Sequence, residues 1–158
     1  PLAGIVGSGV ISNPLMLIDT NSDGLADGYY AAGIGTPSLV TDSNFVGKVQ
    51  NFRTASAGAG VYFRYTASLS AGDMLLVTAK VRKTETDGSR VTFVMVIGGV
   101  TFKLLDIQAA YTGTVSFLCQ NTVAATYLEF FMQYVGTTAT DVGFGELQVY
   151  NLTKLGLA

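Results

Sequence analysis

The sequence of 158 residues contains no histidine, no tryptophan and only one cysteine, Cys119. The absence of histidine excludes a Ser-His-Asp triad, a histidine-ligated zinc ion and general-base catalysis by histidine. A single cysteine also excludes an intrachain disulfide bond. Because Cys119 ends the run Val-Ser-Phe-Leu-Cys, we expect it to be a buried small hydrophobic side chain and not a nucleophile.

Charged residues are scarce, with nine Lys and Arg and eleven Asp and Glu making up 13% of the chain. This balance offers no basic surface, so we expect no nucleic-acid partner. No apolar run approaches the roughly 18 residues of a membrane span, so we expect no membrane insertion. Hydrophobic residues nevertheless make up 49% of the chain. Such a surplus of apolar side chains predicts subunit or domain interfaces, as in a homo-oligomer.

The length of the chain fits a single domain. Residues 1–11 are small and apolar with interspersed glycine and serine, which predicts a linker or an inter-subunit segment. Residues 12–158 are expected to form one β-sandwich domain. Because the chain begins at Pro1 without a Met or a signal peptide, we expect it to be part of a longer polypeptide.

Short segments rich in branched and aromatic residues alternate with turn segments along the chain, and no helical periodicity is present. This pattern predicts an all-β sandwich. A short strand is expected at Leu15–Ile18, and Gly98-Gly99 predicts a two-residue hairpin. The other predicted strands are Ser38–Thr41, Val46–Arg53, Val61–Ala67, Met74–Lys83, Arg90–Ile97, Val100–Leu105, Thr114–Gln120, Tyr127–Val135 and Gly143–Leu152.

Two of these strands alternate clearly enough to assign their faces. The side chains expected in the core are Leu75, Val77, Ala79, Val81, Leu128, Phe130, Met132 and Tyr134. The outward side chains combine aromatic rings with long polar groups, as in a sugar-binding face, but a solvated face or a subunit interface has the same composition. The candidate ligand-binding residues are Tyr127, Glu129, Phe131, Gln133, Lys80 and Arg82, with Tyr111 and Arg64 as further candidates.

The segment Asp19–Asp27 has the first half of a calcium-loop pattern. Oxygen-bearing side chains stand at Asp19, Asn21, Asp23 and Asp27, Gly24 allows a sharp turn, and the seventh position, Leu25, would offer its carbonyl oxygen. An ordinary Asx-rich turn is the alternative. We predict a structural Ca²⁺, because three carboxylates this close repel one another without a cation. Tyr30 occupies the closing position, so another part of the chain or water must complete the ligand set.

Three stretches resemble the calcium-binding, jelly-roll carbohydrate-binding modules found beside glycoside hydrolases and on bacteriophage tail proteins. Residues 12–29 resemble their opening strand and acidic loop, and Gly60–Arg82 resembles their central strand, turn and long following strand. Phe144–Leu152 is similar to their last strand, in which an acid often returns to the calcium. The resemblance implies a jelly-roll β-sandwich of two antiparallel sheets, with Glu146 as the missing calcium ligand and Asp141 as the next candidate.

The resemblance also implies a glycan ligand, although the absence of tryptophan departs from the usual sugar-stacking residue of such modules. The final residues Tyr150–Leu157 look like the endings of some phage tail and baseplate proteins. We therefore expect a trimeric, non-catalytic domain of a virion tail that recognises a bacterial surface glycan. The alternatives are a structural oligomerisation or decoration module of a virion, and an accessory module of a secreted glycoside hydrolase.

An enzyme is not expected, because most of the acidic residues outside the calcium loop lie at turns. Glu129 lies within a strand in aromatic surroundings, but it has no evident second carboxylate at the roughly 5–10 Å that glycoside hydrolysis requires.

Overall fold

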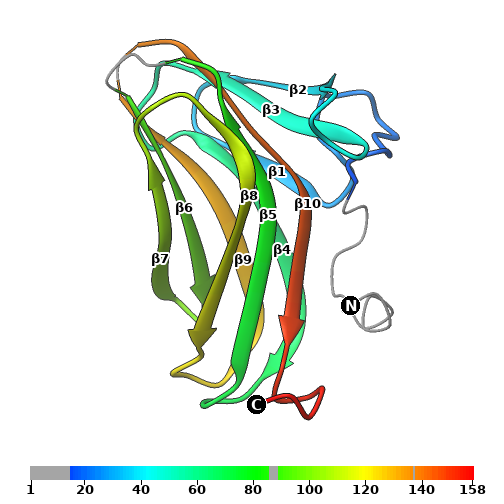
Figure 1. Cartoon of the computed structure of the whole chain (residues 1–158), viewed down its shortest axis with the longest axis vertical. Helices are drawn as coiled ribbons and strands as arrows, with labels where there is room; N and C mark the ends of the chain where they lie inside the picture. Colours follow the sequence, from blue (N-terminus) through cyan, green and yellow to red (C-terminus); the bar gives the residue numbers. More distant parts are fainter. Residues whose placement is uncertain (1–14, 86–88, 137) are drawn as a thin grey trace.

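The computed structural model describes residues 15–85, 89–136 and 138–158, and this part of the chain contains ten β-strands and no helix (Figure 1). The predicted segment 1–11 lies outside the described residues. The strands are β1 (Tyr29–Ala32), β2 (Thr36–Thr41), β3 (Lys48–Thr54), β4 (Gly60–Leu69), β5 (Met74–Lys83), β6 (Arg90–Ile97), β7 (Val100–Ile107), β8 (Tyr111–Gln120), β9 (Ala125–Val135) and β10 (Thr140–Asn151).

The strands form two five-stranded sheets that face each other (Figure 1). The first, called here the β9 sheet, has the order β1-β4-β9-β6-β7, and the second, the β10 sheet, has the order β2-β3-β10-β5-β8. Every pairing between neighbouring strands is antiparallel. The predicted jelly-roll β-sandwich of two antiparallel sheets is therefore confirmed.

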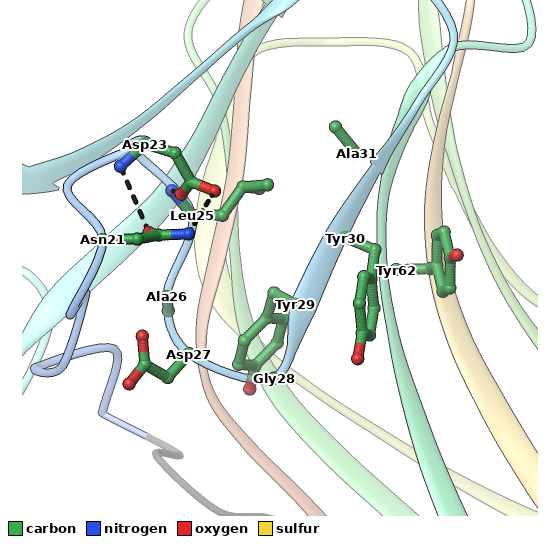
Figure 2. A pocket seen from close by; sticks show the side chains of 10 residues that line it. All are labelled: Asn21, Asp23, Leu25, Ala26, Asp27, Gly28, Tyr29, Tyr30, Ala31 and Tyr62. Atoms are coloured by element: carbon green, nitrogen blue, oxygen red, sulfur yellow. Dashed lines mark hydrogen bonds between the residues drawn. The ribbon is translucent and has the colours of Figure 1, made fainter.

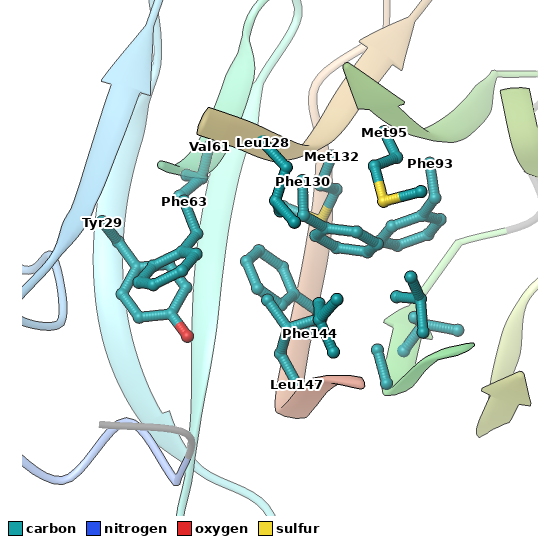
Figure 3. Packing of buried hydrophobic residues seen from close by; sticks show 14 of the residues in the cluster. Tyr29, Val61, Phe63, Phe93, Met95, Leu128, Phe130, Met132, Phe144 and Leu147 are labelled. Carbon is teal, nitrogen blue, oxygen red and sulfur yellow. The ribbon is translucent and has the colours of Figure 1, made fainter. Parts of the chain in front are cut away.

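Aromatic side chains from both sheets fill the space between them (Figure 3). Phe130 of β9 lies at the centre, with its ring centroid 5.8 Å from that of Phe93 and 5.6 Å from that of Phe144 on the opposite sheet. Tyr29 extends this packing, since its ring lies 5.7 Å from Phe144 and 5.0 Å from Phe63. Rings at these separations interact favourably in addition to their burial, so this cluster joins the two sheets.

The alternation predicted for β5 and β9 is confirmed, because all eight side chains expected in the core are at most 1% exposed. The predicted Gly98-Gly99 hairpin is also confirmed, since Ile97 pairs with Val100 across it. Both glycines have positive φ angles, 55° and 84°, as the tight turn between two strands requires.

The strand expected at Leu15–Ile18 is not present, and that prediction was wrong. Met16 has a φ of 55° and places its side chain in the core, whereas Leu17 and Ile18 are more than half exposed. This left-handed residue breaks the alternation that a strand needs. The first strand is instead β1, which was not predicted because its four residues are too few to show a period.

Candidate functional site

Three aromatic side chains form a row across the outer face of the β9 sheet. Register places Tyr30 of β1 beside Tyr62 of β4, and Tyr62 beside Phe131 of β9. Neighbouring positions in paired strands point to the same side of a sheet. The Tyr30 and Tyr62 rings stack with centroids 5.3 Å apart, and Phe131 meets Tyr62 edge-on at 6.0 Å. These three side chains are called the aromatic row below.

An ion pair lies next to the aromatic row on the same face. Arg64 Nε donates a hydrogen bond of 2.7 Å to Glu129 Oε1, and the Arg64 guanidinium lies 5.4 Å from the centre of the Tyr127 ring. The hydrogen bond and the charge of Glu129 raise the pKa of Arg64 above its ordinary value. More than half of the Arg64 side chain remains exposed, so this pair can still offer donors and acceptors to a ligand.

A small hollow of about 190 Å³ opens on this face and is lined mostly by apolar atoms. Tyr62, Phe131 and Glu129 line it. The other lining residues are Ala32 and Val96. The hollow therefore offers mainly ring and other apolar surface, next to the Arg64–Glu129 pair.

The structure brings together four of the predicted ligand-binding residues. Tyr127, Glu129, Phe131 and Gln133 all lie on the outer face of β9, and Gln133 Nε2 is 3.5 Å from the carbonyl oxygen of Gly58. Arg64, a further candidate, joins them through Glu129. The sequence analysis missed Tyr30 and Tyr62, although the alternation of β4 already sets Tyr62 opposite to the core residues Val61 and Phe63.

Lys80 and Arg82 belong to β5 in the β10 sheet, on the opposite outer face of the sandwich. The six predicted ligand-binding residues therefore lie on two opposite outer faces and not on one surface. Tyr111, on β8, also lies in the β10 sheet.

The side chains of Lys80 and Arg82 both donate hydrogen bonds to the loop between β2 and β3. Arg82 donates to Asp42 Oδ2 at 2.9 Å and to Asn51 Oδ1 at 2.7 Å, and its side chain is only 15% exposed. Lys80 donates to the carbonyl of Asn44 and lies 5.3 Å from the centre of the Phe45 ring. These contacts hold the loop against the sheet and leave Arg82 with little surface for a ligand.

Most of the side chains predicted to bind calcium already accept hydrogen bonds within the Asp19–Asp27 loop. Asp23 accepts from the side chain of Asn21 at 2.9 Å and from the backbone N–H of Leu25 at 2.8 Å. Asp27 accepts from the backbone N–H of Thr20 at 2.9 Å and also from the Thr20 hydroxyl. These two bonds hold the pKa of Asp27 below its usual value of 3.8. Asx-turn bonds of this kind also stabilise a loop that holds no metal.

One atom in the loop favours a cation. Asp19 Oδ1 is buried, and within the described residues it has no hydrogen-bond partner. Asp19 Oδ2 accepts the N–H of Gly24 at 3.2 Å. An unpaired buried carboxylate oxygen is costly, and Ca²⁺ prefers such oxygens as ligands. Asp19 and Asp23 both line the hollow beside Pro37 and Lys48, so both lie on this side of the loop.

The two residues proposed to complete the calcium site have other partners. Glu146 lies at an irregularity of β10 with a φ of 52°, and its Oε1 accepts the N–H of Val46 at 2.8 Å. Asp141 pairs with Arg53 at 2.6 Å and also accepts from Asn51. Among residues 15–85, 89–136 and 138–158, no group of three or more His, Cys, Asp or Glu is arranged to hold a metal. Calcium binding therefore stays a prediction.

No protein-family model matches the sequence, and no curated protein matches it. Solved structures do match the fold. A bacteriophage CBA120 tailspike protein 4 enzymatically active domain has a TM-score of 0.66 at 10% identity, over 89% of this chain. This chain spans only 21% of that domain.

Two binding modules match over nearly their whole length. TmCBM61, solved with β-1,4-galactotriose, has a TM-score of 0.59 at 13% identity, covering 90% of this chain and 98% of the module. The xylan-binding domain from CBM 22 has a TM-score of 0.59 at 10% identity, covering 82% of this chain and 90% of that domain. This chain therefore shares the β-sandwich fold of these structures. At these identities the likeness concerns the fold alone.

In the described part of the chain, no helix is long and apolar enough to cross a membrane.

Proposed function

We propose that this domain binds a glycan through the outer face of the β9 sheet, without catalysing a reaction. The observation that carries the proposal is the aromatic row beside the Arg64–Glu129 pair. Aromatic rings pack against the C–H surfaces of sugars, and charged or amide groups hydrogen-bond their hydroxyls. Tyr127 and Gln133 extend the same face and supply further groups of both kinds.

The domain is proposed to serve as a receptor-binding module of a bacteriophage tail that recognises a bacterial surface glycan. The tailspike domain with the same fold supports this setting. The alternative setting, an accessory module of a secreted glycoside hydrolase, is supported by a CBM22-1-GH10 xylanase structure that matches 78% of this chain at a TM-score of 0.57. Either setting would place the domain on a virion or outside the cell.

A structural role in a homotrimer is a second candidate function. Val46 in the loop between β2 and β3 is 66% exposed, and Leu118 on the outer face of the β10 sheet is 63% exposed. Exposed apolar side chains are typical of subunit contacts. Light scattering on the purified chain would decide this point, because a monomer at high protein concentration contradicts the trimer.

A glycan array that compares the wild type with Tyr62→Ala and Phe131→Ala tests the binding proposal. We expect the wild type to bind at least one bacterial surface glycan and each variant to bind it about tenfold or more weakly. Leu118→Ala is the matched control, because it also removes a solvent-facing apolar side chain but on the opposite sheet. Unchanged binding by both aromatic variants would exclude this face.

A further inference from the structure

A second and larger cavity lies at the β1 edge of the β9 sheet, between that strand and the Asp19–Asp27 loop (Figure 2). Its volume is about 500 Å³, which is ample for one sugar ring. The loop contributes Asn21, Asp23 and Asp27 to its lining, and the sheet contributes Tyr30 and Tyr62. It is called the edge cavity below.

Tyr30 offers an aromatic surface to the edge cavity. Figure 2 shows this ring between Tyr62 and the loop. One face of Tyr30 is covered by the stacked Tyr62 ring, yet the residue remains 51% exposed. Because β1 is the edge strand of its sheet, no other strand of the described residues covers Tyr30 on the side of the loop. The ring is therefore available to stack against a ligand in the cavity.

The loop offers hydrogen-bond acceptors that are already held in place. Each oxygen of Asp23 and Asp27 accepts one hydrogen bond within the loop. A carboxylate oxygen has two acceptor positions, so each of these oxygens can still accept from a ligand hydroxyl. Groups fixed before binding lose less conformational freedom when the ligand arrives.

The charge of the edge cavity selects the chemistry of its ligand. Asp23 and Asp27 are acidic, and the described residues that line the cavity include no Lys or Arg. A ligand carboxylate, sulfate or phosphate would be repelled, whereas sugar hydroxyls can donate to both side chains.

We propose that the edge cavity is a second glycan subsite that takes one uncharged sugar unit, stacked on Tyr30 and hydrogen-bonded to Asp23 and Asp27. Tyr62 lines both this cavity and the hollow beside Phe131, so one glycan can cross from the face of the sheet to its edge. The proposal rests on the glycan-binding function proposed for the β9 face. It predicts that the sugar unit held in the edge cavity carries no acidic group.

The test compares wild type, Tyr30→Ala and Asp27→Asn on an array of neutral, uronic-acid and sialylated glycans, with titration of the best ligand. Leu118→Ala is the control for an exposed side chain on the other sheet, and thermal melting checks that each variant is folded. We expect neutral glycans to be preferred, and both edge variants to bind about tenfold more weakly while the control binds as the wild type does.

Three results would overturn the subsite. Binding that is unchanged in both edge variants but lost in Phe131→Ala would confine the ligand to the sheet face and leave the proposed function intact. Preference for an acidic glycan would contradict the charge argument. Loss of wild-type binding in excess chelator, at a temperature where melting shows the domain still folded, would show that the loop binds the sugar only with a cation present and not through its free carboxylates. If the wild type bound no glycan at all, the proposed function itself would fail, and the subsite with it.

Discussion

The rings of Tyr30 and Tyr62 stack across β1 and β4 with centroids 5.3 Å apart and planes inclined by 26°. These residues are 32 positions apart in the chain, and antiparallel pairing sets them side by side. Since Tyr62 also lines the hollow beside Phe131, it connects the edge of the sheet to its centre. Tyr62 therefore occupies the middle of the proposed glycan path.

Replacing Tyr62 by Phe and by Ala separates the contribution of its ring from that of its hydroxyl. Tyr62→Phe keeps the stack on Tyr30, so we expect glycan affinity within about threefold of the wild type, whereas Tyr62→Ala should lower it by about tenfold or more. Calorimetric titration of the best array ligand measures both. Equal losses in the two variants would mean that the hydroxyl, and not the ring, makes the important contact.

Arg82 is expected to contribute to stability and not to ligand binding. Arg82→Ala removes the donor that Arg82 provides to Asp42 Oδ2 and Asn51 Oδ1, in a site where the Arg82 and Asp42 side chains are only 15% and 13% exposed. We expect the free energy of unfolding to fall by about 2–4 kcal/mol, with unchanged glycan affinity. Urea denaturation and glycan titration check the two parts. A large loss of affinity at unchanged stability would restore Arg82 as a ligand-binding residue.

Phe130 and Phe131 are adjacent in β9 and point to opposite faces, so they form a matched pair. Phe130 is fully buried between Phe93 and Phe144, and Phe130→Ala should lower the free energy of unfolding by about 3–5 kcal/mol. Phe131→Ala, on the partly exposed face, should cost clearly less stability and should lower glycan affinity instead. Chemical denaturation of both variants measures the difference, and equal losses of stability would contradict the assignment of the faces.

Asp42 makes the stability of the domain sensitive to acid. The backbone N–H of Asn44, followed by the Arg82 side chain, lowers the pKa of Asp42 from 3.8 in the folded state. The folded state therefore binds this proton less readily than the unfolded chain does. The contribution to stability is present above pH 3.8 and is lost as the pH falls through the lower, folded pKa.

Unfolding free energies measured from pH 6 to pH 2 should show this loss, and Asp42→Asn should flatten the curve below about pH 4. Asp23→Asn is a suitable control, because it changes an exposed carboxylate elsewhere on the molecule. A curve for Asp42→Asn that runs parallel to that of the wild type would exclude Asp42 as the group responsible.

Calcium binding at the Asp19–Asp27 loop can be tested without a glycan. A cation that binds only the folded state raises the melting temperature, so excess chelator should lower it. Asp19→Asn should abolish the difference, because it removes the charge on the carboxylate whose Oδ1 is buried without a partner among the described residues. Glu146→Gln should not abolish it, since Glu146 already accepts from Val46. A wild-type melting temperature that does not respond to chelator would show that the loop is only a turn.

Local pattern alone determined the fold class and the core faces. The alternation of Leu75, Val77, Leu128 and Phe130 predicted correctly which side of each strand is buried, because a strand has a period of two regardless of its neighbours. The Gly98-Gly99 hairpin was likewise predictable from a short sequence signal. The composition also excluded catalysis and metal binding by histidine, because the absence of a residue type does not depend on how the chain folds.

Tertiary structure alone decided which outward faces belong to one surface. Arg82 and Phe131 are both outward residues of regular strands, yet β5 and β9 lie in different sheets, so their side chains point away from each other. Conversely, Tyr30, Tyr62 and Phe131 come from three distant segments and meet in one row through strand register. The side to which a residue points is a local property, whereas the strand that lies beside it depends on pairings between segments far apart in the chain.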